Sequence, residues 1–126
     1  MKSSIPFQFV VEELERANPF VRPMFGCHAI YVGNKIVLVL RNREDYPRDN
    51  GVWVATGKEH HESLKTNFPS LRSLELFGGS ETNWQNIPAE ADDFEESVIQ
   101  VCSLIVKGDP RIGRIPKLKK KKRRTR

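Results

Sequence analysis

A cysteine and a histidine stand side by side at Cys27 and His28, directly after a glycine. These two residue types do thiol chemistry when the imidazole lies within hydrogen-bond reach of the thiol, about 2.6–3.2 Å. The surrounding residues predict a β-strand, and neighbours on a strand point to opposite faces of the sheet. We therefore expect Cys27 to face the core as a small buried hydrophobe and His28 to point away, so that the two form no catalytic dyad.

The other residues with metal-ligand chemistry are His60, His61 and Cys102. Zinc sites usually show Cys-x-x-Cys or His-x-x-x-His spacing, and the sequence contains neither pattern. His60 and His61 are adjacent on a predicted helix, so their side chains point about 100° apart and do not converge on one centre. The sequence therefore predicts no metal, no other cofactor and no small-molecule ligand, and we expect a protein that is not an enzyme.

The basic end of the chain, PKLKKKKRRTR, is the strongest functional pattern. Residues 111–126 hold ten of the 21 Lys and Arg residues and none of the 16 Asp and Glu residues, so they carry +10 and residues 1–110 carry −5. A basic arm gains affinity for nucleic acid by releasing condensed counterions, and its phosphate contacts carry no base information. The tail residues expected to contact nucleic acid are Lys117, Lys119, Lys120, Lys121, Lys122, Arg123, Arg124 and Arg126.

The tail contains no aromatic residue that stacks on bases, so we do not expect it to read a single strand by itself. Two other interpretations of the tail stay open. It is either a solubilising segment without a dedicated partner, or an arm for another anion such as a membrane surface or an acidic protein.

The elements that position these residues follow from hydrophobic periodicity. Apolar residues at helical spacing predict helices over 7–17 and about 89–107, and a capping-box pattern predicts a third over about 58–67. The predicted strands are the two runs that flank Gly33–Asn34, followed by residues 52–56, 71–77 and 84–88. Short antiparallel connections between them indicate an α+β fold, a two-layer α/β sandwich with a mostly antiparallel sheet and three helices.

Gly33–Asn34 predicts a two-residue turn, whose register places Tyr31 opposite Ile36 and Ile30 opposite Val37. The sheet face that the helices leave open is then expected to carry a group of apolar residues. They are Ile30, Val32, Val37 and Val39. Such a face predicts homodimerisation, or docking of a protein partner, with partial cover by a loop as the alternative.

The composition fits one globular domain of 126 residues, 38% of them hydrophobic. No segment approaches the roughly 20 apolar residues of a membrane helix, and the N-terminal residues lack the apolar centre of a signal peptide. We therefore expect a cytoplasmic protein without membrane insertion, in which both cysteines are reduced thiols. The expected organisation is a folded domain over residues 1–110 and a flexible basic tail over 111–126.

Two motifs in the chain have a counterpart in a known family. The first is formed by Met24, Phe25, Gly26, Ile30 and Tyr31, and the second by Trp84, Ile87 and Pro88 ahead of an acidic-then-apolar helix. Together they resemble the N-terminal domain of TfoX/Sxy-like proteins, which are named for bacterial regulators of competence. The resemblance covers about residues 8–107, although Cys27 and Ala29 stand where that family usually has glycines. It implies a small two-layer sandwich in a stand-alone member that lacks the family's C-terminal domain.

The leading functional hypothesis is a non-enzymatic binding or regulatory module whose basic tail contacts nucleic acid. A protein-interaction scaffold or homodimer that uses the open sheet face is the second hypothesis. The third is a small enzyme with a cleft near Cys27, Tyr46, His60 and His61.

Overall fold

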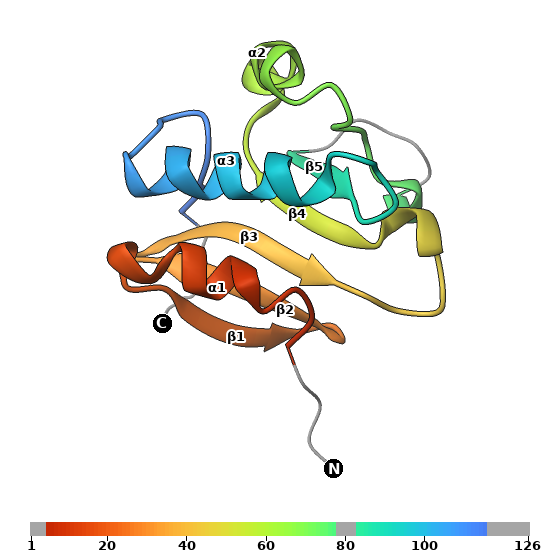
Figure 1. The fold of residues 1–126 in the computed structure, drawn as a ribbon, viewed down its shortest axis with the longest axis horizontal. Coiled ribbons are helices and arrows are strands. Elements are labelled where there is room, and N and C mark those ends of the chain that lie inside the picture. Colours follow the sequence, from red (N-terminus) through yellow and green to blue (C-terminus); the bar gives the residue numbers. More distant parts are fainter. Residues whose placement is uncertain (1–4, 78–82, 116–126) are drawn as a thin grey trace, which may run out of the picture.

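The computed structural model describes residues 5–77 and 83–115, which form an antiparallel sheet with helices on one face (Figure 1). The five strands of the described residues are ordered β1-β2-β3-β4-β5 across the sheet. They are β1 (Phe20–Met24), β2 (Cys27–Val32), β3 (Lys35–Arg41), β4 (Gly51–Ala55) and β5 (Trp84–Pro88). The α-helices of the described residues are α1 (Phe9–Glu13), α2 (His61–Asn67) and α3 (Phe94–Val106). The predicted α+β two-layer sandwich is confirmed.

The main core lies between the sheet and the helices α1 and α3, which run side by side over one face (Figure 1). The apolar stripe of α3 supplies Val98, Val101, Cys102 and Ile105 to this core. The sheet supplies the buried side chains of Ile30, Val37, Leu38, Leu40, Val52, Val54 and Ile87. Burial of each such aliphatic side chain stabilises the fold by about 1.5–3 kcal/mol relative to exposure, which is why a helix with this spacing docks here.

The β2–β3 hairpin turns at Gly33–Asn34 as expected, and Tyr31 lies opposite Ile36. A bulge then breaks the register, so that Ile30 faces Leu38 rather than Val37. A bulge inserts one extra residue into one strand, and every later pair is displaced by one position. The predicted pairs beyond Tyr31 and Ile36 are therefore wrong.

The four residues predicted to form an open apolar face do not do so. Ile30 and Val37 are 0% and 3% exposed beneath the helices, and Val32 is half-buried beside them. Val39 is also fully buried, but on the opposite side of the sheet. The prediction is wrong for two reasons. The helices cover the sheet face that was expected to be open, and the bulge moves the side chain of Val39 to the opposite face of the sheet.

The second sheet face carries a smaller core that the segment before β5 covers in part. Buried residues of this core include Cys27, Val39, Trp53 and Leu74. The covering segment was predicted as a strand over 71–77, but it pairs with β5 only at Arg72 and then forms the 3-10 helix η4 (Glu75–Phe77).

Asp49, buried in the 3-10 helix η2 (Pro47–Asp49), holds this covering segment in place. Its carboxylate oxygens accept the backbone N–H groups of Glu75 and Leu76 at 2.9 and 2.7 Å. Its carbonyl oxygen accepts the indole N–H of Trp53 at 2.9 Å. One buried carboxylate thus joins the second core to the start of η4.

Residues 111–115 belong to the folded part, although the sequence places a domain boundary at residue 110. Ile112 is buried in the main core. The N–H of Gly113 donates to the carbonyl of Ala55 at 2.7 Å, and Arg114 exchanges two backbone hydrogen bonds with Ile36 at 2.9 and 3.0 Å. The segment therefore bridges the ends of β3 and β4. The candidate tail residues Lys117, Lys119 to Lys122, Arg123, Arg124 and Arg126 lie outside the described residues.

Candidate nucleic-acid interface

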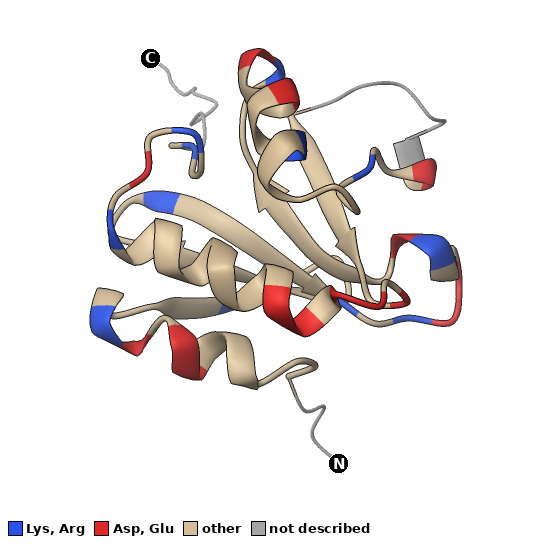
Figure 2. Cartoon of the chain, turned by 45° about the horizontal axis from the view of Figure 1, so that its top comes forward, with Lys and Arg blue, Asp and Glu red and all other residues tan. Residues whose placement is uncertain are grey.

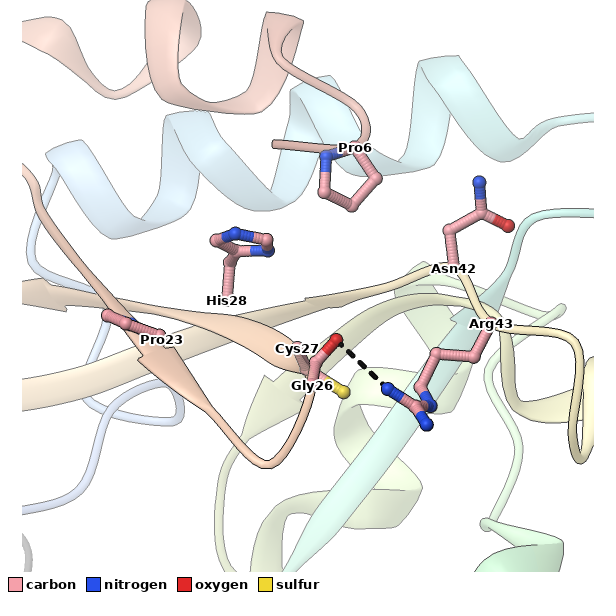
Figure 3. A pocket seen from close by; sticks show the side chains of 7 residues that line it. All are labelled: Pro6, Pro23, Gly26, Cys27, His28, Asn42 and Arg43. Atoms are coloured by element: carbon pink, nitrogen blue, oxygen red, sulfur yellow. Dashed lines mark hydrogen bonds between the residues drawn. The ribbon is translucent and has the colours of Figure 1, made fainter. Parts of the chain in front are cut away.

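Cys27 and His28 lie on opposite sides of β2, as the strand alternation predicts (Figure 3). The imidazole points toward Pro6 and the helices, whereas the sulfur lies on the other side of the sheet. The thiol donates to the carbonyl of Phe25 at 3.8 Å. Burial raises the pKa of the Cys27 thiol, and the nearby guanidinium of Arg41 opposes that rise only in part. The sulfur is thus held as a protonated thiol, which is a poor nucleophile.

A pocket of about 480 Å³ lies beside this pair, lined by Pro6, Pro23, Gly26, Cys27, His28, Asn42 and Arg43 (Figure 3). The cation at its edge is already paired, because the guanidinium of Arg43 contacts a carboxylate oxygen of Asp45 at 3.1 Å. Among the described residues that line it, the pocket includes none of His60, His61 and Tyr46. The residues proposed for an enzyme cleft are therefore not brought together here.

The other candidate ligands are separated as well. His61 is buried in α2, and His60 lies in the 3-10 helix η3 (Lys58–His60) beside Glu59, at 3.6 Å. Cys102 is buried in α3, where desolvation raises its pKa to about 12. Within residues 5–77 and 83–115, His, Cys, Asp and Glu side chains form no group that could hold a metal ion.

A different surface brings chemistry-bearing residues together on the second sheet face. Phe20, Arg22 and Met24 alternate along the edge strand β1 and pair with Tyr31, Ala29 and Cys27 of β2. Residues directly opposite each other in an antiparallel pair share a face, so these β1 side chains stand beside Tyr31. The surface continues across Trp84 of β5 to the C-terminal segment. We call it the aromatic–arginine face and define it by Phe20, Arg22, Met24, Tyr31, Trp84, Arg114 and Ile115.

The centre of the aromatic–arginine face is hollow. A pocket of about 460 Å³ is lined by Met24, Tyr31, Ile36, Asn83, Trp84, Arg114 and Ile115. At its margins Phe20 is 60% exposed and Ile115 is 62% exposed, so two large apolar side chains border the pocket in contact with solvent. The guanidinium of Arg22 lies 5.9 Å from the centroid of the Tyr31 ring, within the range of a cation–π contact.

The two arginines of this face differ from most others in the described part of the chain. Arg41, Arg43, Arg48, Arg72 and Arg111 each contact a carboxylate. Among the described residues, neither Arg22 nor Arg114 has a carboxylate partner, although Arg114 donates to the carbonyl of Thr56 at 3.1 Å. No Asp or Glu belongs to the described lining of the pocket. The face therefore offers two positive charges that the surrounding fold does not neutralise.

The basic tail is joined directly to this face. Ile115, the last described residue, lines the pocket, and the sequence continues with Pro116 and Lys117. Residues 116–126 contain eight Lys or Arg residues and no acid. The point at which this charged segment joins the described chain therefore lies at the rim of the aromatic–arginine face.

The sequence alone did not indicate this face, since the residues after the first predicted helix were interpreted only as the end of that helix. Pro23 lies in the edge strand β1, where a proline is tolerated because its missing N–H faces no partner strand. The alternation of Phe20, Arg22 and Met24 was the available signal.

Comparison of the chain with models of protein families, with curated proteins and with solved structures gives no match. Within the described residues, every helix is too short or too polar to cross a membrane. The fold class and the chemistry of the aromatic–arginine face are therefore the basis for a functional proposal.

Proposed function

We propose that this protein is a non-enzymatic nucleic-acid-binding module that uses the aromatic–arginine face together with its basic tail. The observation that carries the proposal is that Arg22 and Arg114 have no carboxylate partner among the described residues. Arg22 shares one face of β1 with the exposed ring of Phe20, and Arg114 lines the pocket of the same face. The eight cations of the tail begin at the same place in the fold. Positive charge and aromatic surface are the two features that nucleic acids recognise in proteins.

The arginines and the tail would act on phosphates. Each phosphate that a cation neutralises releases condensed counterions and adds about 0.9 to the salt slope of log K on duplex DNA, or about 0.7 on a single strand. Such contacts hold the polymer without reading its sequence. The tail would therefore supply most of the affinity, while the face would fix where on the protein the polymer lies.

A protein partner is the competing occupant of this face, because Phe20 and Ile115 are exposed and apolar. Docking of an apolar protein surface would remove Arg22 from water without a carboxylate to pair with it, which is unfavourable. A polyanion avoids this cost, because its phosphates pair with the guanidinium of Arg22. The resemblance to TfoX/Sxy-like N-terminal domains, with its regulatory role, stays a prediction that is compatible with nucleic-acid binding.

The proposal is tested by titrating fluorescein-labelled DNA and RNA with the intact protein at several salt concentrations. A tail variant, in which the eight cations of residues 116–126 are replaced by glutamine, is expected to reduce the salt slope by several units. Arg22→Gln is expected to reduce the slope by about 0.7–0.9, the value of one phosphate contact. Arg16→Gln is the matched control, because Arg16 is an exposed arginine next to α1 on the helix side.

The result that would overturn the proposal is binding that is absent, or equal for the intact protein and the tail variant at every salt concentration. Circular dichroism of each variant confirms that it is folded before its affinity is interpreted.

A further inference from the structure

We infer that the aromatic–arginine face selects single-stranded over double-stranded nucleic acid, with unpaired bases stacking on Phe20 and Tyr31. This inference rests on the proposed function and names the class of polymer that the same face takes. It is carried by the cross-strand pairing of the two aromatic residues, by the pocket between Tyr31 and Trp84, and by the chemistry of the pocket lining.

Phe20 and Tyr31 are a directly opposed cross-strand pair, so their Cβ atoms lie about 4.5–5.5 Å apart on the same face. The pair belongs to β1 and β2, and β1 is the edge of the sheet. Two neighbouring rings on a rigid sheet form a platform on which consecutive unpaired bases can stack. The guanidinium of Arg22 lies over the Tyr31 ring, 5.9 Å from its centroid. A base that stacks on Tyr31 takes this place, and the cation then turns to the intervening phosphate.

A duplex is excluded from these contacts by its own structure. Its bases are stacked on one another, so their π faces are hidden and only groove edges and phosphates reach a protein surface. In the described part of the chain this face is made of sheet strands and the short segment that ends at Ile115, so it presents no helix to the major groove. Duplex binding is therefore limited to phosphate contacts with the arginines and the tail, whereas a single strand gains those contacts and the stacking as well.

The hollow at the centre of the face adds a place for one base. Its volume of about 460 Å³ falls within the range of small-molecule pockets, about 300–1,000 Å³. Tyr31 and Trp84 contribute aromatic walls, and Met24, Ile36 and Ile115 contribute apolar ones. The side chains of Asn83 and Arg114 stand at the same pocket and offer hydrogen bonds to the edge of a base or to its phosphate.

The tail complements this platform rather than competing with it. It contains no aromatic residue, so it contributes phosphate contacts to either polymer to a similar extent. Discrimination between a single strand and a duplex then has to come from the rings of the face. The two proposals can therefore be separated by experiment. Removal of tail charge weakens the binding of single strands and duplexes alike, whereas removal of a ring weakens the binding of single strands only.

The experiment compares three fluorescein-labelled probes of equal length at one salt concentration. They are a mixed-sequence single strand, the corresponding duplex, and a single strand of abasic nucleotides that keeps the phosphates. We expect the intact protein to bind the single strand at least tenfold more tightly than either of the other probes. Loss of one stacked base lowers affinity by about 5- to 150-fold.

The ring variants are Phe20→Leu and Tyr31→Leu, which keep apolar bulk while removing the π face. Each is expected to lose at least fivefold in affinity for the single strand and less than twofold for the duplex. Tyr46→Leu is the matched control, because Tyr46 is an exposed aromatic residue in the loop after β3.

Each outcome has a defined meaning. Equal affinity for the three probes, with the salt dependence of the tail intact, overturns the strand selectivity but leaves the nucleic-acid-binding function. A single-strand preference that survives both ring variants overturns the assignment to this face. Absence of binding to every probe overturns the selectivity and the proposed function together.

Discussion

Arg41 is almost fully buried at the end of β3, and its guanidinium organises the loop that follows. Its Nη1 atom donates to the carbonyl of Tyr46 and to Oδ1 of Asn50, both at 2.9 Å. Its Nη2 atom donates to the carbonyl of Asp45 at 2.8 Å and lies 3.3 Å from a carboxylate oxygen of the same residue. A buried cation thus donates three hydrogen bonds to the loop over residues 45–50.

We predict that Arg41→Ala lowers the free energy of unfolding by about 2–4 kcal/mol, because a buried side chain is removed and partly buried acceptors in the loop lose their donors. Urea denaturation followed by circular dichroism measures the change. Arg43→Ala is the control, since Arg43 contacts the same Asp45 but is exposed, and a surface ion pair contributes little. Equal destabilisation by the two variants would contradict the role of burial.

Cys102 makes stability depend on alkaline pH. Burial, together with the charge of Glu13, raises the pKa of its thiol from 9.0 to about 12. Below pH 9 the thiol is protonated in both the folded and the unfolded state. Between pH 9 and 12 the unfolded state loses the proton first, so this group makes stability fall by up to about 1.4 kcal/mol per pH unit.

The corresponding prediction compares the intact protein with Cys102→Ala by urea denaturation at pH 8, 9 and 10. The variant is less stable at pH 8 because it leaves a small cavity, but it lacks the thiol titration. The difference between the two free energies of unfolding should therefore shrink as the pH rises. A difference that stays constant over this range would show that the thiol does not titrate differently in the two states.

At the level of elements, the segment 111–115 is the part of the fold that extends past the predicted domain boundary. The hydroxyl of Thr56 donates to the carbonyl of Arg111 at 2.6 Å. The guanidinium of Arg111 donates to Ser63 Oγ at 2.6 Å and to Asn67 Oδ1 at 3.0 Å, which ties the segment to α2. These contacts make it a structural element rather than the start of the tail.

We predict that a chain ending at residue 110 is less stable than one ending at residue 115 by roughly 3–5 kcal/mol. The shorter chain loses the burial of Ile112 and the backbone hydrogen bonds of Gly113 and Arg114. Thermal and urea unfolding of both chains, with the full chain as reference, measures the effect. Equal stability of the two truncated chains would place the boundary at residue 110 after all.

The elements that the sequence predicted well are those that local residues specify. Helical periodicity located α3, and Gly33–Asn34 located the turn of the β2–β3 hairpin. At the bulge, Val37 and Leu38 both contribute to the main core. The bulge was not predictable, because residues 36–40 are all aliphatic and show no alternation of polar and apolar residues that would mark its position. The insertion of residues 113–114 between β3 and β4 depends on contacts with chain more than 50 residues away, and no local pattern signals it.

The candidate site was predictable from the sequence only in its tail. The tail is visible in the sequence because charge needs no fold to be counted. The aromatic–arginine face joins β1, β2, β5 and the C-terminal segment, so its residues come together only through the strand order. Each single residue looks ordinary, and only their shared sheet face is informative.

At the scale of the whole molecule, charge is distributed unevenly between the two layers. Acidic residues gather on the helix layer (Figure 2), where Glu12, Glu13, Glu95 and Glu96 are exposed. Arg22 and Arg114 lie on the opposite sheet face, where the tail is joined. The outer surface of the helix layer and the far face of the sheet are roughly 20 Å apart, from a helix diameter of about 10–12 Å and a layer spacing of about 10 Å. A polyanion bound to the sheet face does not touch the acidic layer. The repulsion between the two therefore acts only through the long-range electrostatic field.

Such a field is screened by salt over the Debye length, about 30 Å at 0.01 M and about 8 Å at 0.15 M. We predict that replacing these four glutamates by glutamine raises the affinity for a labelled oligonucleotide several-fold at 0.01 M salt and less than twofold at 0.15 M. Arg22→Gln, a change at the contact itself, should weaken binding instead, and by about 7- to 11-fold more at 0.01 M than at 0.15 M, because it lowers the salt slope by about 0.7–0.9. If the glutamate variant instead strengthened binding equally at both concentrations, the oligonucleotide would have to lie against the helix layer, and the assignment of the interface to the sheet face would be wrong.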